Sequence, residues 1–139
     1  LRDVYKRQEL AGAENIYTFG KDSESIIKLY ETAGYVSKEY YENDKDIKRA
    51  VDFILNPAVV KLGNKTRLER LYNELLNKDW FMTLIDFNAY VEAKEQILAD
   101  YEDQDSWNEK VVHNIAKAGF FSSDRTIAQY NADIWHCEG

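Results

Sequence analysis

Cysteine, histidine, proline and glycine are all scarce in this chain of 139 residues. The one cysteine, Cys137, excludes an internal disulfide and is typical of a reducing compartment, so we expect a cytoplasmic protein. One proline and six glycines leave few positions for tight turns, which favours helices. A zinc site built from His and Cys needs about four ligands, and two histidines and one cysteine cannot supply them.

Long apolar runs and an excess of positive charge are absent as well. No stretch of about 18 apolar residues occurs, so we expect no membrane-spanning helix. Lys and Arg number 18 against 25 Asp and Glu, which gives a net charge of −7. Nucleic acids and anionic membranes repel an acidic surface, and we expect neither as a partner.

The first eight residues, LRDVYKRQ, differ from the sequence that follows. They are rich in basic residues and show neither helical nor strand periodicity. They also resemble the peptide that results when sequencing-adapter DNA is translated. We therefore interpret residues 1–8 as a non-native leader and residues 9–139 as the natural part of the chain.

Two segments carry the composition of β-strands. NIYTFG (15–20) is a β-branched and aromatic run that ends at a glycine, as buried strands do. DWFMTLIDF (79–87) is apolar and is either a second short strand or a buried loop. Because a buried strand needs neighbours on both sides, one or two strands predict an α/β fragment, mostly α, whose sheet is incomplete.

Apolar residues at helical spacing predict helices over most of the remaining chain. The expected helical segments are 21–34, 37–43, 43–57, 63–79, 86–103, 106–119 and 122–135. Asp22 or Ser23 is the expected cap of the first helix, and SWNE (106–109) predicts a capping box. The last helix is expected to begin at Ser122 or Ser123.

From the residues alone we assign no catalytic, cofactor-binding or metal-binding residue. The acidic cluster DYEDQD (100–105) lacks the glycine and the glutamate of an EF-hand and is interpreted as a solvated helix end. His136 and Cys137 are adjacent and His113 is distant in sequence, so neither a metal centre nor a Cys–His nucleophile is indicated. Gly20 is a single glycine and does not predict a phosphate-binding loop.

Aromatic pairs and one arginine leave alternatives open. Tyr40–Tyr41 and Trp80–Phe81 could stack on sugars, but pairs at this spacing more often belong to a core. Arg125 is expected to pair with an acidic neighbour rather than to bind phosphate. Carboxylates are abundant, yet no acid–base pair stands out, so a hydrolase has no support.

The end of the chain resembles that of a known family. WNEKVVHNIAKA (107–118) followed by GFFSSDRTIAQYNADIW (119–135) is similar to the end of the α-glucan phosphorylases, which comprise the glycogen, starch and maltodextrin enzymes. The resemblance extends upstream through ELAGAENIYTFG (9–20), GYVSKEYYEND (34–44) and DFNAYVEAKEQI (86–97). The chain is therefore identified as a C-terminal fragment of a phosphorylase.

The resemblance implies an activity and a fold. Members of the family release glucose 1-phosphate from α-1,4-glucan ends with inorganic phosphate, using pyridoxal phosphate bound to a lysine. They have two Rossmann-like domains of the GT-B glycosyltransferase type, form homodimers and include allosteric enzymes. The fragment would belong to the C-terminal domain, with a terminal helix at 122–135 that docks on the rest of the phosphorylase chain.

The resemblance also sets limits. The family's cofactor-lysine motif, Gly-Thr-Gly-Asn-Met-Lys, has no counterpart here. We therefore expect the fragment to bind no pyridoxal phosphate and to be inactive alone. The alternative is a free-standing helical interaction module.

Overall fold

The computed structural model describes residues 2–137 of the chain, and within this range it contains helices, turns and extended segments but no β-strand. The α/β prediction is therefore wrong. The chain divides into two compact units. We call Thr18–Glu95 the central unit, and we call the segment through Tyr17 together with the segment from Gln96 onward the terminal unit.

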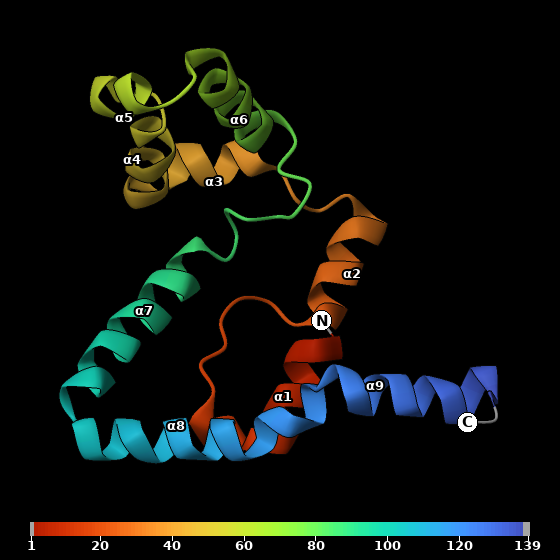
Figure 1. The fold of residues 1–139 in the computed structure, drawn as a ribbon. Coiled ribbons are helices and arrows are strands. Elements are labelled where there is room, and N and C mark those ends of the chain that lie inside the picture. The colour runs from red at the N-terminus through yellow and green to blue at the C-terminus, as the bar shows by residue number, and fades with distance from the viewer. Residues whose placement is uncertain (1, 138–139) are drawn as a thin grey trace. The chain divides into compact units, whose positions relative to one another are not determined.

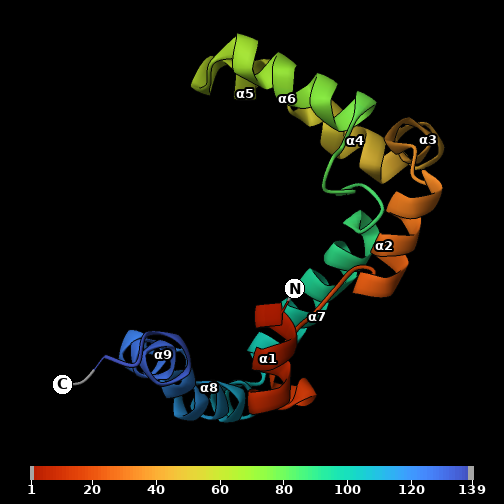
Figure 2. The same cartoon turned by 90° about the vertical axis from the view of Figure 1, so that its right-hand side faces the viewer.

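The central unit is built from consecutive short helices. They are α2 (Ser23–Thr32), α3 (Ser37–Asn43), α4 (Lys45–Phe53), α5 (Pro57–Leu62), α6 (Lys65–Asn77) and the first part of α7 (Phe87–Glu102). Helix α3 contacts α4 and α6, and both α4 and α5 contact α6 (Figure 1). Figure 2 shows α6 alongside α4.

Side chains cap the starts of four of these helices, because the first backbone N–H groups of a helix have no partner within it. Each cap accepts a hydrogen bond from an N–H two or three residues ahead; the caps are Asp22, Asn64, Asp44 and Asn56. Asp22 was one of the two predicted caps. The sequence did not predict α5, which begins at Pro57, where the missing N–H of proline costs no helical hydrogen bond.

The core of the central unit is small. Ile47 and Val51 of α4 are buried together with Leu84 from the loop that precedes α7. Half-buried residues surround these three; they are Tyr40, Tyr41, Tyr72, Leu76 and Phe87. Fully burying one aliphatic side chain stabilises a fold by about 1.5–3 kcal/mol, and α4 contributes two such side chains, Ile47 and Val51.

The segment NIYTFG (15–20) is not a strand. Asn15 ends a 3-10 helix, Ile16 is extended and Gly20 has a positive φ, while the aromatic rings of the segment pack on helices. Within the terminal unit, the Tyr17 ring stacks on Trp107, and within the central unit Phe19 meets Tyr90 edge-on at 5.2 Å between ring centroids. β-branched and aromatic residues favour any half-buried extended surface, and here helices provide the cover that a neighbouring strand would give.

The segment DWFMTLIDF (79–87) is a series of turns leading into α7, so the loop alternative is the correct one. Two of its residues, Asp79 and Met82, have positive φ angles of 37° and 52°. This left-handed conformation is incompatible with a strand and costs a residue other than glycine roughly 1–2 kcal/mol. Burial of the apolar Met82 and Leu84 side chains, together with the hydrogen bonds that the Asp79 carboxylate accepts, offsets this cost.

The terminal unit combines both ends of the described chain. It contains α1 (Arg2–Ala11), η1 (Ala13–Asn15), the end of α7, α8 (Gln104–Ala118), η2 (Gly119–Phe121), α9 (Ser123–Tyr130) and the π-helical η3 (Asn131–Trp135). Helix α8 contacts α1 (Figure 1). It also contacts η1 and η2, and α9 contacts η2 and η3. Residues 2–8, which lack periodicity in the sequence, form most of α1.

The helix starts of the terminal unit differ from expectation in one case. Helix α8 begins at Gln104 with Asp103 as its N-cap, so the capping box predicted at Ser106 is wrong. Ser106 instead donates its hydroxyl to Asp103 Oδ2 at 2.7 Å. At α9 the cap is Ser122, whose Oγ accepts from the Arg125 N–H at 3.3 Å.

Truncating the buried core should destabilise the central unit. Ile47 is only 2% exposed, so Ile47→Ala removes apolar contacts and leaves a cavity, which should lower the free energy of unfolding by about 2–5 kcal/mol. Leu62→Ala, at a side chain that is 91% exposed, should change it by less than about 0.5 kcal/mol. Urea unfolding followed by circular dichroism checks both, and equal effects of the two substitutions would contradict the assigned core.

Removing the cap of α9 should loosen the start of that helix. Ser122→Ala deletes the acceptor of the Arg125 N–H and should cost about 0.5–2 kcal/mol of local stability. Hydrogen exchange at Arg125 should therefore accelerate. Ser123→Ala is the matched control and should leave that exchange nearly unchanged; the reverse order would place the cap at Ser123.

Candidate functional site

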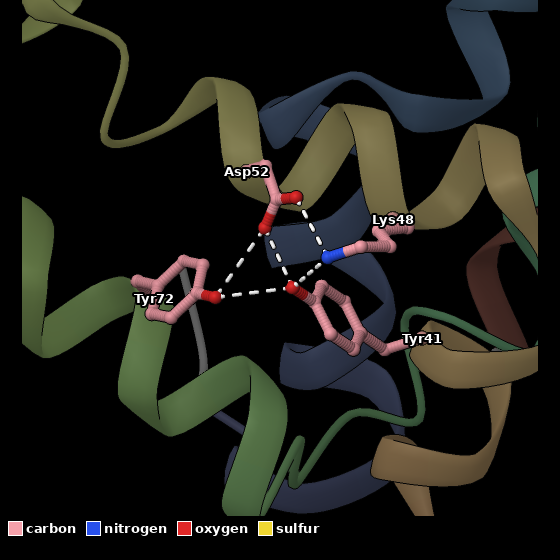
Figure 3. A network of polar contacts seen from close by, with 4 residues as sticks. All are labelled: Tyr41, Lys48, Asp52 and Tyr72. Atoms are coloured by element: carbon pink, nitrogen blue, oxygen red, sulfur yellow. Dashed lines mark hydrogen bonds and ion pairs between the residues drawn. The ribbon is translucent and has the colours of Figure 1, made fainter.

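Four polar side chains from three helices meet on the central unit (Figure 3). Lys48 Nζ of α4 lies 2.9 Å from Asp52 Oδ2 and donates to the Tyr41 hydroxyl of α3 at 2.5 Å. The Tyr41 hydroxyl donates to Asp52 Oδ1 at 2.7 Å, and the Tyr72 hydroxyl of α6 lies 3.3 Å from the same oxygen. The two phenol oxygens are 3.2 Å apart.

The network shifts the proton equilibria of its members. Hydrogen bonds from Tyr41 and then Lys48 hold the pKa of Asp52 below its usual value. The hydrogen bond to Tyr41 and the ion pair with Asp52 raise the pKa of Lys48. The bond to Tyr41, with burial next, raises the pKa of Tyr72 to about 12.

Each of these shifts moves the pKa of its group further from pH 7. A general acid or base works best when its pKa lies near the working pH, and Asp52 and Lys48 both stay charged there. Their side chains are 44% and 49% exposed, so the carboxylate also lacks the apolar pocket that a catalytic acid needs. The network therefore ties α3, α4 and α6 together, and its geometry does not support proton transfer.

A second polar centre lies at the loop before α7. The buried carboxylate of Asp79 accepts hydrogen bonds from the Leu84 N–H, at 2.9 Å, and from the Tyr35 hydroxyl. Burial and then the bond to Asp79 raise the pKa of Tyr35. A carboxylate with two donors in a buried site is satisfied, so Asp79 fixes the loop.

The acidic cluster at 100–105 has structural partners. Asp100 accepts from the Tyr17 hydroxyl and from Gln96 Nε2, each at 2.5 Å, and Asp103 caps α8. These bonds lower the pKa of Asp100, and the bonds from Ser106, the hydroxyl first, lower that of Asp103. The cluster forms the junction of α7 and α8.

Candidate metal ligands do not come together. Across residues 2–137 no three His, Cys, Asp or Glu side chains are placed to hold a metal ion. His113 lies on α8, whereas His136 and Cys137 follow η3 and are exposed. Within the same range no helix is both long and apolar enough to cross a membrane.

Gly20 lies in a turn that requires a positive φ angle. Its φ is +86°, and a Cβ atom at this position would come within 2.5 Å of Asp86 Oδ2. Asp86 Oδ1 accepts from the N–H of Lys21 at 2.9 Å. The glycine therefore allows a carboxylate to approach the backbone, which explains its presence without a phosphate.

The two aromatic pairs differ in their burial. Tyr40 and Tyr41 pack against the core cluster, as expected. Trp80 and Phe81 are 67% and 90% exposed, so the core prediction is wrong for this pair. Burial in a turn follows no fixed period, so no sequence pattern marks these two side chains as exposed.

Among the residues that the structure describes, no acidic side chain pairs with Arg125, so the expected ion pair is not found there. Its guanidinium lies over the Phe120 ring, 3.9 Å from the centroid. Nη1 donates to Gln129 Oε1 at 2.6 Å, and Nε donates to the carbonyl of Phe120. These bonds fix the turn between α8 and α9 and leave the guanidinium engaged within its own chain.

The terminal unit exposes many apolar side chains along α8, α9 and η3. They are Val112, Ile115, Ile127, Tyr130, Ile134 and Trp135. Large exposed apolar surfaces mark interaction sites. The side chains expected to dock from residues 122–135 are thus accessible in the terminal unit.

Removing the Tyr41 hydroxyl should raise the pKa of Asp52 toward 3.8, because its strongest hydrogen bond is lost. A lowered folded-state pKa contributes stability above the unfolded-state value, and this contribution is lost as the pH falls through the folded-state value. Tyr41→Phe should therefore weaken the acid dependence of unfolding. Carbon-13 NMR titration of Asp52 checks this. Tyr72→Phe is the control: it removes a longer hydrogen bond and should shift the pKa of Asp52 less. An unchanged pKa of Asp52 in Tyr41→Phe would refute the assigned network.

Sequence comparison finds close relatives among glucan phosphorylases. The chain is 65% identical over 128 residues to the maltodextrin phosphorylase of Streptococcus pneumoniae, which covers 92% of this chain and 17% of the relative. It is 39% identical over 128 residues to the glycogen phosphorylase of Bacillus subtilis, covering 91% and 16%. It is 39% identical over 130 residues to the brain form of glycogen phosphorylase of Ovis aries, covering 94% and 15%.

These matches cover most of this chain but only a small fraction of each relative. The chain spans about 15–17% of the length of these curated proteins. The family described as carbohydrate phosphorylase matches residues 6–137, which is nearly the whole chain. The resemblance found at the sequence level is confirmed, and the chain belongs to the carbohydrate phosphorylase family.

Proposed function

We propose that this chain is the C-terminal part of an α-glucan phosphorylase, an enzyme that releases glucose 1-phosphate from α-1,4-glucan ends with inorganic phosphate. The observation that carries the proposal is the family match over residues 6–137 together with 65% identity to a maltodextrin phosphorylase. In this proposal residues 9–139 belong to the enzyme's C-terminal domain, and residues 1–8 are a leader foreign to it, although the family match begins at residue 6.

The residues of this chain do not fit the expected cofactor. A lysine that forms a Schiff base must lose its proton, which burial favours by lowering its pKa. Among the described residues no lysine is buried, and hydrogen bonds raise the pKa of Lys48 and of Lys94. We therefore propose that pyridoxal phosphate is held by another part of the enzyme and that this chain alone is inactive.

The proposed role of the chain is to complete the enzyme. The polar networks around Asp52 and Asp79 join helices, and the exposed apolar side chains of α8, α9 and η3 offer a surface to the rest of the phosphorylase chain. Through that chain it would act on glucan and phosphate, within a cytoplasmic homodimer.

A free-standing helical interaction module is the second candidate. One observation favours it: the central unit has a buried core of its own, formed by Ile47, Val51 and Leu84. A module of this kind would fold and act without a phosphorylase partner. Its predicted behaviour therefore differs from that of an enzyme fragment.

A chimera tests the proposal. The segment of the Streptococcus pneumoniae maltodextrin phosphorylase that matches this chain is replaced by the 128 residues of this chain that align with it. We expect the chimera to release glucose 1-phosphate from maltodextrin and phosphate, because the two segments are 65% identical. The isolated chain should release none.

Two controls give the result its meaning. The same relative with the matching segment deleted should be inactive, which shows that the segment is required. An inactive chimera that is nevertheless folded and binds pyridoxal phosphate would contradict the proposal. In that case, a monomeric isolated chain with a sharp unfolding transition would favour the interaction module.

A further inference from the structure

The loop at 78–86 presents two large aromatic side chains to solvent. Phe81 is 90% exposed and Trp80 is 67% exposed, whereas the residues on either side of the pair, Asp79 and Met82, are 5% and 4% exposed. The loop thus buries its flanks and displays its centre. An apolar ring gains nothing from such exposure.

Several hydrogen bonds hold the loop in this form. The Asp79 carboxylate accepts from the Leu84 N–H, and the Met82 N–H donates to the Asp79 carbonyl at 2.7 Å. The Tyr30 hydroxyl donates to the carbonyl of Trp80 at 2.5 Å. Asp79 and Met82 have positive φ angles, and unfavourable backbone of this kind persists only where the surroundings impose it.

The surface around the pair has the composition of a protein interface. Trp80 borders a hollow of about 150 Å³; its other apolar or aromatic lining residues include Leu29, Tyr30, Tyr35 and Met82. At its edge Lys78 Nζ lies 3.3 Å from Glu74 Oε1 and 6.0 Å from the centroid of the Trp80 ring. Protein interfaces combine aromatic anchors at the centre with a polar rim.

We propose that the loop at 78–86 is a docking site, through Trp80 and Phe81, for the remaining part of the phosphorylase polypeptide. This inference rests on the proposed function. The relatives are about six times longer than the matched segment, since it spans 15–17% of their length, so the larger part of such an enzyme is available to cover the loop.

Two other occupants fit less well. A sugar ring needs hydrogen-bonding groups beside the aromatic face, and Lys78, whose Nζ lies over the Trp80 ring, is paired with Glu74. A second copy of the chain would bring together two molecules that each carry a net charge of −7, which opposes association. A polypeptide surface requires only apolar contact with Phe81.

Thiol labelling tests the docking site. Phe81→Cys is made together with Cys137→Ser, both in the isolated chain and in the chimera described above, whose remaining cysteines are serine. In the isolated chain the new thiol should react with a maleimide as fast as Leu62→Cys, at a side chain that is 91% exposed. In the chimera the Phe81→Cys thiol should react at least about tenfold more slowly, because burial protects it.

A second measurement tests the docking site if the Phe81→Cys variant does not fold. A photoreactive benzoylphenylalanine at position 81 of the chimera keeps an aromatic ring there. Irradiation should cross-link it to the part of the relative outside the replaced segment, and mass spectrometry identifies the attachment point. Absence of this cross-link in an active chimera would overturn the docking site.

The remaining outcomes separate this inference from the proposed function. An active chimera whose Phe81→Cys thiol stays as reactive as in the isolated chain refutes the docking site and leaves the proposed function intact. A folded but inactive chimera with the unaltered segment refutes the proposed function and, with it, the docking site. Slower labelling of the isolated chain on adding maltodextrin, or on raising its own concentration, would assign the loop to a glucan or to a second copy and also overturn the inference.

Discussion

The buried carboxylate of Asp79 organises the central unit. It accepts hydrogen bonds from the Leu84 N–H and the Tyr35 hydroxyl, and thereby joins the α2–α3 connection to the loop before α7. An unpaired charge in such a position would be costly, whereas one with two donors is tolerated. Because the bond to Leu84 places that side chain beside Ile47 and Val51, the core depends on it. The exposed position of Trp80 and Phe81 follows from the same constraint.

Helices were predictable where apolar spacing and local capping agreed. The segments 37–43 and 63–79 match α3 and α6 within a few residues, because both signals lie within one helical turn of the sequence. The start of α8 was misplaced because Asp103 and Ser106 are both good caps and only their mutual bond decides between them. Helix α5 begins at a proline, and its six residues are too few to show a helical period.

The predicted strand and the polar centres show where sequence reasoning ends. The composition of a run such as 15–20 predicts that its side chains pack against another element. Residues far along the chain decide whether that element is a strand or a helix. The partners of Tyr17 and Tyr35 are Asp100 and Asp79, which lie 83 and 44 positions away. No local spacing encodes such pairs. Family resemblance was readable because it depends on residue identity and not on geometry.

The tyrosines give the chain an unusual alkaline behaviour. Burial, with the bond to Asp100 next, raises the pKa of Tyr17 to about 12, and Tyr72 has a similar value. A raised folded-state pKa contributes stability that is fully present below the unfolded-state value of about 10 and is lost as the pH rises through the folded-state value. Tyr17 belongs to the terminal unit and Tyr72 to the central unit. Each phenolate absorbs differently from its phenol, so late-ionising tyrosines are built-in optical reporters of the opening of each unit in base.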